Sequence, residues 1–163
     1  MNSDFNKDAL LRSAKRINVS YFKEQQEDAI NAIWQWWQSQ SISFTLSGYA
    51  GTGKTFIMRH LVRYLIVEKV CVTAPTHKAL RVLENSSGKK GMTIQSLCGL
   101  RPDVDIEDYN IENPSFKVIG EQKMRGYRLV IIDECSMINP GLFNLLIKTA
   151  IQYRCKLLFL GEM

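Results

Sequence analysis

The stretch "SGYAGTGKTF", Ser47 to Phe56, packs three glycines into ten residues and contains Gly-Lys-Thr near its end. Glycine loses more conformational freedom on folding than any other residue, so such a cluster indicates a special backbone geometry. Residues 48–55 fit the pattern G-x-x-x-x-G-K-[ST], and they follow a predicted strand and open a predicted helix. That context is the one the pattern requires, and it predicts a loop whose backbone N–H groups surround a phosphate chain.

Each polar group of this loop has an expected task. The backbone that surrounds the phosphates is expected to come from Gly48, Gly51, Thr52 and Gly53. The helix that follows adds the positive end of its dipole. Lys54 is expected to reach the β and γ phosphates of a nucleotide, and Thr55 to place its hydroxyl on Mg²⁺. The alternative, a glycine-rich turn with a chance Gly-Lys-Thr, explains the flanking strand and helix less well.

A second motif, "LVIIDECSM" at residues 129–137, ends an apolar run with two carboxylates. Asp133 lies where a parallel sheet presents its ligands, and it is expected to share the Mg²⁺ shell with Thr55. Glu134 is suited to polarise an attacking water. An isolated Asp-Glu pair is more often a solvated surface pair. Downstream of a phosphate loop it indicates hydrolysis, because a kinase has little use for a water-activating Glu.

Strand and helix signals alternate along the chain. Buried strands are predicted at residues 42–46, 70–74, 129–133 and 156–161, and helices at 8–16, 23–38, 55–67, 77–85 and 140–152. This alternation predicts an α/β fold with a parallel sheet flanked by helices. In the helix at 23–38 an apolar stripe predicts the core face, and it includes Ala29, Ile30, Ile33, Trp34 and Trp37 but leaves Trp36 outside. Residues 101–126 break the rhythm, and their Asn113-Pro114 turn signal predicts an inserted β-hairpin, with a surface loop as the alternative.

Two further stretches carry polar groups suited to binding. In "VTAPTHKAL" (72–80), Pro75 stops a strand, and Thr76, His77 and Lys78 open a helix. Hydroxyl, N–H and ammonium groups at a helix start suit a nucleic-acid phosphate, and a plain loop with a Thr cap explains them about equally well. In "FKEQQEDAI" (22–30), the Gln26 amide can donate to and accept from a base edge, although an exposed helical Gln is the simpler explanation in isolation.

Composition sets broad limits. Of 163 residues, 45% are hydrophobic and 23% charged, an ordinary balance for one globular domain. A net charge of +5 permits a polyanionic partner without requiring one. No apolar run approaches the length of a membrane span and no signal peptide is evident, so we expect a cytoplasmic protein. The four cysteines show neither paired nor metal-ligand spacing, and they indicate reduced, mostly buried side chains.

Taken in order, these motifs resemble the first motor domain of superfamily 1 DNA helicases, and within them the RecD-like and Dda-like branch. The resemblance covers about residues 22–163. "GYAGTGKT" resembles helicase motif I, "APTHKAL" motif Ia, "TIQSLCGL" (93–100) the next DNA-contacting motif, and "IIDECSMI" motif II. Gln26 stands at the position of the family's adenine-reading glutamine.

The resemblance implies a RecA-like P-loop NTPase fold, ATP and Mg²⁺ as ligands, and DNA as the partner. It implies that Lys54 binds the phosphates, that Thr55 and Asp133 hold Mg²⁺, and that Glu134 activates water. The implied DNA track runs over Pro75, Thr76, Lys78 and Thr93, with His77 beside them. The insert at 101–126 matches the position of a small duplex-splitting hairpin in this branch.

Two departures from the family pattern stand out. Gln95 replaces a histidine that the family often has, and it can hydrogen-bond but cannot take a charge. Near the end, "LFLGEM" has Glu162 where the family has an aspartate, and the γ-phosphate-sensing glutamine beyond it is absent. We therefore expect residues 1–163 to be a single RecA-like domain, truncated before the second motor domain.

The expected function is that of the ATP-binding motor domain of a 5′-to-3′ DNA helicase. Its expected partners are single-stranded DNA and duplex junctions, in replication, recombination or repair. One alternative is another P-loop enzyme, a kinase or a non-helicase ATPase. The other is a nucleotide-binding module without catalysis, which the intact Lys54, Thr55, Asp133 and Glu134 disfavour.

Overall fold

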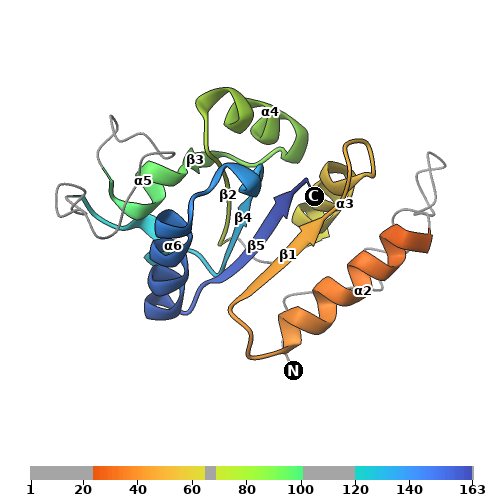
Figure 1. The fold of residues 1–163 in the computed structure, drawn as a ribbon, viewed down its shortest axis with the longest axis horizontal. Coiled ribbons are helices and arrows are strands. Elements are labelled where there is room, and N and C mark those ends of the chain that lie inside the picture. Colours follow the sequence, from red (N-terminus) through yellow and green to blue (C-terminus); the bar gives the residue numbers. More distant parts are fainter. Residues whose placement is uncertain (1–23, 65–68, 101–119, 163) are drawn as a thin grey trace.

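Apolar segments of the chain pair into one parallel sheet. The computed structural model describes residues 24–64, 69–100 and 120–162. Within these ranges five strands pair in the order β1-β5-β4-β2-β3, and every pair is parallel (Figure 1). The strands are β1 (Ser43–Ser47), β2 (Val70–Ala74), β3 (Gly91–Thr93), β4 (Leu129–Ile132) and β5 (Lys156–Gly161).

Helices cover both faces of this sheet. The described α-helices are α2 (Glu24–Gln38), α3 (Lys54–Tyr64), α4 (His77–Ser87), α5 (Ile94–Cys98) and α6 (Pro140–Tyr153). Two 3-10 turns, η1 (Lys123–Gly126) and η2 (Cys135–Met137), flank β4 in the sequence. The core cluster on one face includes residues of α2, α3 and α4, and the cluster on the other includes residues of α5 and α6. None of the described helices combines the length and apolar character needed to cross a bilayer.

Alternation along the strands explains the two-faced core. In β4, Leu129 and Ile131 pack into the cluster with α2, α3 and α4, whereas Val130 and Ile132 pack into the opposite cluster. All four side chains are at most 1% exposed. A strand covered on both faces needs apolar residues at successive positions, which is why these runs are continuous.

The predicted α/β fold is confirmed, and so are its four predicted strands, with ends shifted by at most one residue. A fifth strand, β3, and the short helix α5 were not predicted. The strand β3 is three residues long and pairs with β2 at the edge of the sheet. A Cβ on Gly91 would lie 2.2 Å from the carbonyl oxygen of Val72, so glycine permits this close pairing.

Trp36 corrects the predicted core face of α2. Its side chain is only 5% exposed, although it lies outside the predicted stripe. Its ring packs 5.7 Å from the ring of Phe44 in β1, and the Lys156 ammonium lies 4.8 Å from its centroid. The edge strand and this lysine therefore cover a second side of the helix.

The predicted insert at residues 101–126 is described only in its last part. Residues 120–126 hold no strand, and η1 packs there against α5, so the basic end of the insert belongs to the body of the domain. The backbone N–H of Gly120 donates to the carbonyl of Gly99 at 3.0 Å. The predicted hairpin turn, the predicted helix at 8–16 and the predicted end of the helix at 65–67 lie outside the described residues.

Parallel pairing gathers all strand ends at one edge of the sheet. Beyond β1 lies the glycine-rich loop, beyond β4 lies Asp133, and beyond β5 lies Glu162. Beyond β2 lies Pro75, and Thr93 ends β3. Because the strand order is β1-β5-β4-β2-β3, the first group forms one half of this edge and the second group forms the other.

Candidate functional site

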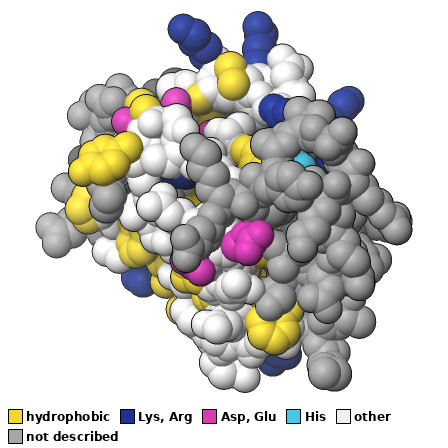
Figure 2. Space-filling view, turned by 90° about the vertical axis from the view of Figure 1, so that its right-hand side faces the viewer, with side chains coloured by type: hydrophobic (Ala, Val, Ile, Leu, Met, Phe, Trp, Pro, Cys, Tyr) yellow, Lys and Arg dark blue, Asp and Glu magenta, His cyan; other side chains and the backbone are white. Residues whose placement is uncertain are grey.

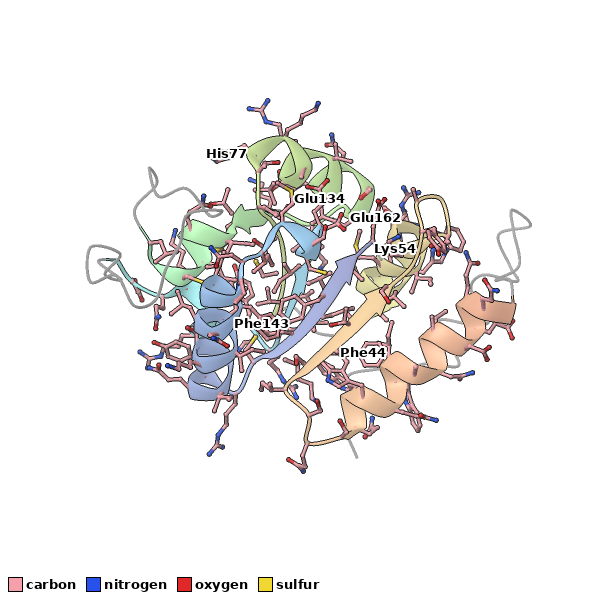
Figure 3. All side chains as sticks on the ribbon, in the orientation of Figure 1. Phe44, Lys54, His77, Glu134, Phe143 and Glu162 are labelled. Carbon is pink, nitrogen blue, oxygen red and sulfur yellow. The ribbon has the colours of Figure 1, made fainter. Side chains whose placement is uncertain are left out.

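A first pocket opens between the glycine-rich loop and the turns that follow β4 and β5. The residues that line it are Ala50, Gly51, Gly53, Lys54, Thr55, Phe56, Asp133, Glu134, Ser136, Met137, Gly161 and Glu162. Figure 3 shows Lys54, Glu134 and Glu162 gathered near the upper ends of the strands, although each comes from a different element. The structure thus brings together two motifs that are about 80 residues apart in the sequence.

The Lys54 ammonium is held by the loop itself. Its Nζ donates to the carbonyl of Gly48 and, at 2.9 Å, to the carbonyl of Tyr49. The Thr52 hydroxyl also donates to the Tyr49 carbonyl, at 2.8 Å. The loop therefore closes around its own lysine. An anion that enters the pocket can take a third donor of the ammonium or displace one of these carbonyls.

Gln26 lies against the same loop, although it comes from the first turn of α2. Its Nε2 donates to the carbonyl of Thr52 at 3.3 Å. A Cβ on Gly53 would come within 2.2 Å of this Nε2, and the backbone of Gly53 has φ +92°. Glycine at position 53 thus serves two purposes, because it adopts a positive φ and leaves room for the amide.

Asp133 sits at the mouth of the pocket directly after β4. Its backbone N–H donates to the carbonyl of Thr73 at 3.0 Å, which ties the turn to β2. Burial raises the pKa of its carboxyl above the usual value, and a hydrogen bond from the N–H of Glu134 and the positive charge of Lys54 act in the opposite direction. The carboxylate is therefore a costly charge in a partly dry site, where a cation would stabilise it.

Glu134 has a left-handed backbone, with φ 53° and ψ 41°. Non-glycine residues rarely adopt this conformation, which costs about 1–2 kcal/mol, and such strain concentrates at functional sites. Its N–H donates to Oδ1 of Asp133 at 2.9 Å. The strained turn aims two successive carboxylates at the same pocket.

Six residues that line this pocket were not predicted as site residues: Ala50, Phe56, Ser136, Met137, Gly161 and Glu162. Ser136 and Met137 belong to η2, and Glu162 lines the pocket from the end of β5. Their positions follow from the turn after β4 and from the pairing of β5 between β1 and β4. Of these three, only Glu162 had a signal in the sequence, its place where the family has an aspartate.

A second pocket lies on the other half of the same sheet edge. It is lined by Pro75, Thr76, His77, Thr93, Gln95, Ser96, Gly99, Leu100, Gly120, Glu121 and Lys123. Four of the five predicted nucleic-acid contacts meet here, from the starts of α4 and α5. The hydroxyls of Thr76 and Thr93 accept the N–H groups of Ala79 and Ser96, at 3.2 Å and 3.3 Å, and so cap these two helices. Each hydroxyl keeps its own proton for a ligand.

The fifth predicted contact, Lys78, does not line the second pocket. It lies in a groove on the outer face of α4 with His77, Arg81, Val82 and Asn85. His77 is exposed and borders both the second pocket and this groove, and Figure 3 shows it at the start of α4. Gln95, Ser96, Gly99 and Leu100 line the second pocket and belong to the stretch 93–100 that resembles a DNA-contacting motif, whereas Gly120, Glu121 and Lys123 were not predicted as site residues.

Residues 21–163 match the AAA domain family. The chain is 35% identical over 136 residues to an uncharacterized protein of Acanthamoeba polyphaga mimivirus, covering 73% of this chain and 28% of that protein. It is 31% identical over 142 residues to the ATP-dependent DNA helicase Dda of Enterobacteria phage T4, covering 85% of this chain and 31% of the helicase. It is also 27% identical over 100 residues to the ATP-dependent DNA helicase Pif1 of a Psychrobacter strain, covering 61% and 15% respectively.

The chain spans less than a third of the length of each of these relatives. Two of the three are named as ATP-dependent DNA helicases, so the predicted resemblance to the helicase motor domain is confirmed. The family match covers the loop, both carboxylates of motif II and the second pocket. This chain therefore belongs to the AAA domain family.

Proposed function

We propose that this chain is the ATP-binding motor domain of a DNA helicase, in which hydrolysis drives movement 5′ to 3′ on single-stranded DNA and separation of duplex junctions. The observation that carries the proposal is the meeting of Lys54, Asp133 and Glu134 in one pocket beside the glycine-rich loop. Similarity to two proteins named as ATP-dependent DNA helicases supports it. We further propose that residues 1–163 form a single RecA-like ATP-binding domain.

Lys54 and Glu134 are the proposed catalytic residues. The β and γ phosphates take the place of the loop carbonyls that hold Lys54, and its ammonium then stabilises the charge that develops on the γ-phosphate oxygens. Glu134 accepts a proton from the attacking water. The water oxygen bonds to phosphorus as the bond to the β–γ bridging oxygen breaks, and ADP leaves with that electron pair.

Thr55 and Asp133 are the residues that would hold Mg²⁺. A hydroxyl and a carboxylate fit this ion, which prefers oxygen ligands and keeps several waters rather than an all-protein cage. Mg²⁺, when bound, offsets negative charge on the phosphate oxygens. Both residues line the pocket, and the half-buried Asp133 carboxylate gains from a neighbouring cation.

Gln26 is the proposed reader of the adenine base. Its amide stands within hydrogen-bonding distance of the loop that would hold the phosphates. An amide can donate to one atom of a base edge and accept from its neighbour. The phosphate-binding backbone of Gly48, Gly51, Thr52 and Gly53 completes the proposed nucleotide site.

The second pocket is the proposed contact with single-stranded DNA. Pro75, Thr76, His77 and Thr93 border it, and the capping threonines offer hydroxyl protons to phosphate oxygens. If the ATP-bound, ADP-bound and nucleotide-free states of the protein bind DNA with different affinities, each cycle of hydrolysis moves the protein between weak and strong DNA binding. That difference is how chemical energy would become movement.

The test compares nucleotide binding and turnover in two variants. Lys54→Ala should weaken binding of a fluorescent Mg-ATP analogue, because it removes a charge from the phosphates. Glu134→Gln should bind the analogue almost as the parent does and lose hydrolysis by at least about 10²-fold, because an amide cannot take the proton. Loss of binding with normal turnover per bound ATP in Glu134→Gln would show that the roles are wrong.

Stimulation by DNA separates the helicase from its alternatives. Hydrolysis is measured with and without oligo(dT), on this chain and on any longer protein that contains it. A helicase motor should turn over faster with the oligonucleotide. A kinase or unrelated ATPase should be indifferent to it, and a non-catalytic module should bind nucleotide without turnover in either condition.

A further inference from the structure

Among the residues that the structure describes, one lysine lines the second pocket, and it was not among the predicted contacts. Of the described residues that line this pocket, Lys123 alone is a lysine or arginine. It belongs to η1, which follows the segment at 101–119 and lies 30 residues beyond Thr93 in the sequence. A pocket that binds a phosphate chain needs positive charge, because phosphate contacts supply most of the affinity for nucleic acid.

Packing fixes Lys123 beside the predicted contacts. Its neighbour Met124 is fully buried in the core cluster with α5 and α6, which anchors η1. The Nζ of Lys123 donates to the hydroxyl of Ser96 at 3.2 Å, and the N–H of Ser96 donates to the Thr93 hydroxyl at 3.3 Å. A lysine ammonium has three donors, so the remaining ones can face a phosphate.

Lys78 occupies a different environment. Together with Arg81 and Val82 it lines the groove on the outer face of α4. Figure 2 shows Lys and Arg side chains projecting from the top of the molecule, the edge at which Figure 1 places α4. Lys78 and Lys123 are both exposed, so water screens both charges, and the two lysines differ in position: Lys123 lines the pocket in which four predicted contacts meet, whereas Lys78 does not.

Glu121 places a negative charge in the same pocket as Lys123. A carboxylate there opposes a phosphate backbone, so removing its charge should strengthen binding. Neutralising Lys123 and neutralising Glu121 should therefore change the affinity for nucleic acid in opposite directions, and each effect can be measured in its own variant.

We propose that Lys123, and not Lys78, is the lysine that contacts the phosphate backbone of single-stranded DNA in this domain, with Ser96 positioning its ammonium. The inference rests on the proposed function, because it assumes that the second pocket holds the DNA. It changes the predicted track, which then runs from the start of α4 across α5 to η1 rather than over the outer face of α4.

The test measures binding of fluorescently labelled oligo(dT) to this chain as a function of salt. Neutralising one phosphate contact on a single strand reduces the slope of log K against log salt by about 0.7, which corresponds to about fivefold weaker binding at 0.1 M salt. Lys123→Gln should show both changes, and Lys123→Arg should restore the affinity. The matched control Lys78→Gln should stay within about twofold of the parent, and Glu121→Gln should bind more tightly.

Two results would overturn the proposal. An equal or larger loss in Lys78→Gln would place the track over the outer face of α4. Parental binding by Lys123→Gln would exclude Lys123 as a contact. Unchanged Mg-ATP binding and circular dichroism in each variant show that a loss is not unfolding. If the parent binds Mg-ATP but no oligo(dT) at low salt, the proposed function fails with it, which distinguishes that failure from an error about Lys123 alone.

Discussion

Replacing Gly53 by alanine should destabilise the nucleotide-free chain through two separable effects. The first is backbone strain, because φ at this position is +92°. A left-handed conformation costs a residue with a Cβ about 1–2 kcal/mol. The second is a clash, because the new Cβ would lie 2.2 Å from Nε2 of Gln26. That amide can swing away, but it then gives up its hydrogen bond to Thr52, worth about 0.5–1.5 kcal/mol.

The two effects together predict a loss of about 2–3 kcal/mol in the free energy of unfolding, measured by urea denaturation. Gly51→Ala is the matched control. Its φ is +77°, yet no atom lies within 4 Å of the new Cβ, so it should show the backbone cost alone. Gln26→Ala supplies the second arm of a double-mutant cycle, since it removes the clash while leaving the backbone strain.

In the Gln26→Ala background, the cost of Gly53→Ala should therefore fall by about 1 kcal/mol, toward that of Gly51→Ala. If Gly53→Ala costs the same in both backgrounds, then the Gln26 amide does not rest on the loop in solution. The proposed link between the base-reading residue and the phosphate loop would then be wrong.

Three further predictions concern stability and the thiols. Lys156→Met should lower the free energy of unfolding by about 2 kcal/mol and the melting temperature by about 4–8 °C, because the charged donor is lost; its Nζ donates to the carbonyls of Trp36, Ser39 and Ser41 at 3.0, 2.9 and 2.8 Å. The exposed Lys148→Met is its control, and equal melting temperatures would refute the anchoring role. At pH 8 a thiol reagent should modify Cys135 first in the native chain, because Cys135 is half-buried whereas Cys71, Cys98 and Cys155 are buried. Burial raises the pKa of all four thiols, that of Cys71 to about 11 and those of Cys98 and Cys155 to about 12. Since unfolding lets these thiols ionise nearer pH 9.0, the unfolded state binds fewer protons above that pH, and stability should fall as pH rises toward 11; urea midpoints that stay level or increase over this range would contradict the assignment.

The strands of the central sheet were predictable because a strand that is buried on both faces consists almost entirely of apolar residues. β2 and β4 are fully apolar except for Thr73, and both lie in the middle of the sheet. β3 gave no such signal. Its sequence "GMT" is short, partly exposed and begins with a glycine, so its strand state depends on pairing with β2 rather than on its own residues.

Trp36 shows a limit of helical periodicity. The stripe predicted one buried face of α2, but β1 and Lys156 reach around the helix and bury Trp36 as well. A periodic pattern identifies the side of a helix that packs on the sheet. Whether a second side of the helix is also buried depends on residues that are distant in the sequence. Phe44 is eight residues from Trp36, but Lys156 is 120 residues away, and no local signal announces it.

The residues of the candidate site also divide into those with a local sequence signal and those placed by contacts between distant parts of the chain. The residues of the loop and the Asp133-Glu134 pair were predictable, because their spacing and their places after strands follow from the chemistry of phosphate binding. Lys123 was not, because its neighbour Ser96 is 27 residues away and the segment between them interrupts the rhythm of the sheet. Lys78 drew the prediction instead, because it stands next to Thr76 and His77 in the sequence. On a helix, adjacent positions point about 100° apart, so Lys78 need not line the second pocket although His77 does.

Strand order suggests how the two pockets could influence each other. β4 lies between β5 and β2, so the turn that carries Asp133 separates the half of the sheet edge with the first pocket from the half with the second pocket. The N–H of Asp133 donates to the carbonyl of Thr73 at 3.0 Å, and Thr76 follows Thr73 by three residues. A nucleotide that shifts Asp133 would therefore pull on the strand that leads into the second pocket. Coupling of this kind is reciprocal, so whatever factor ATP imposes on the affinity for oligo(dT), oligo(dT) must impose on the affinity for ATP.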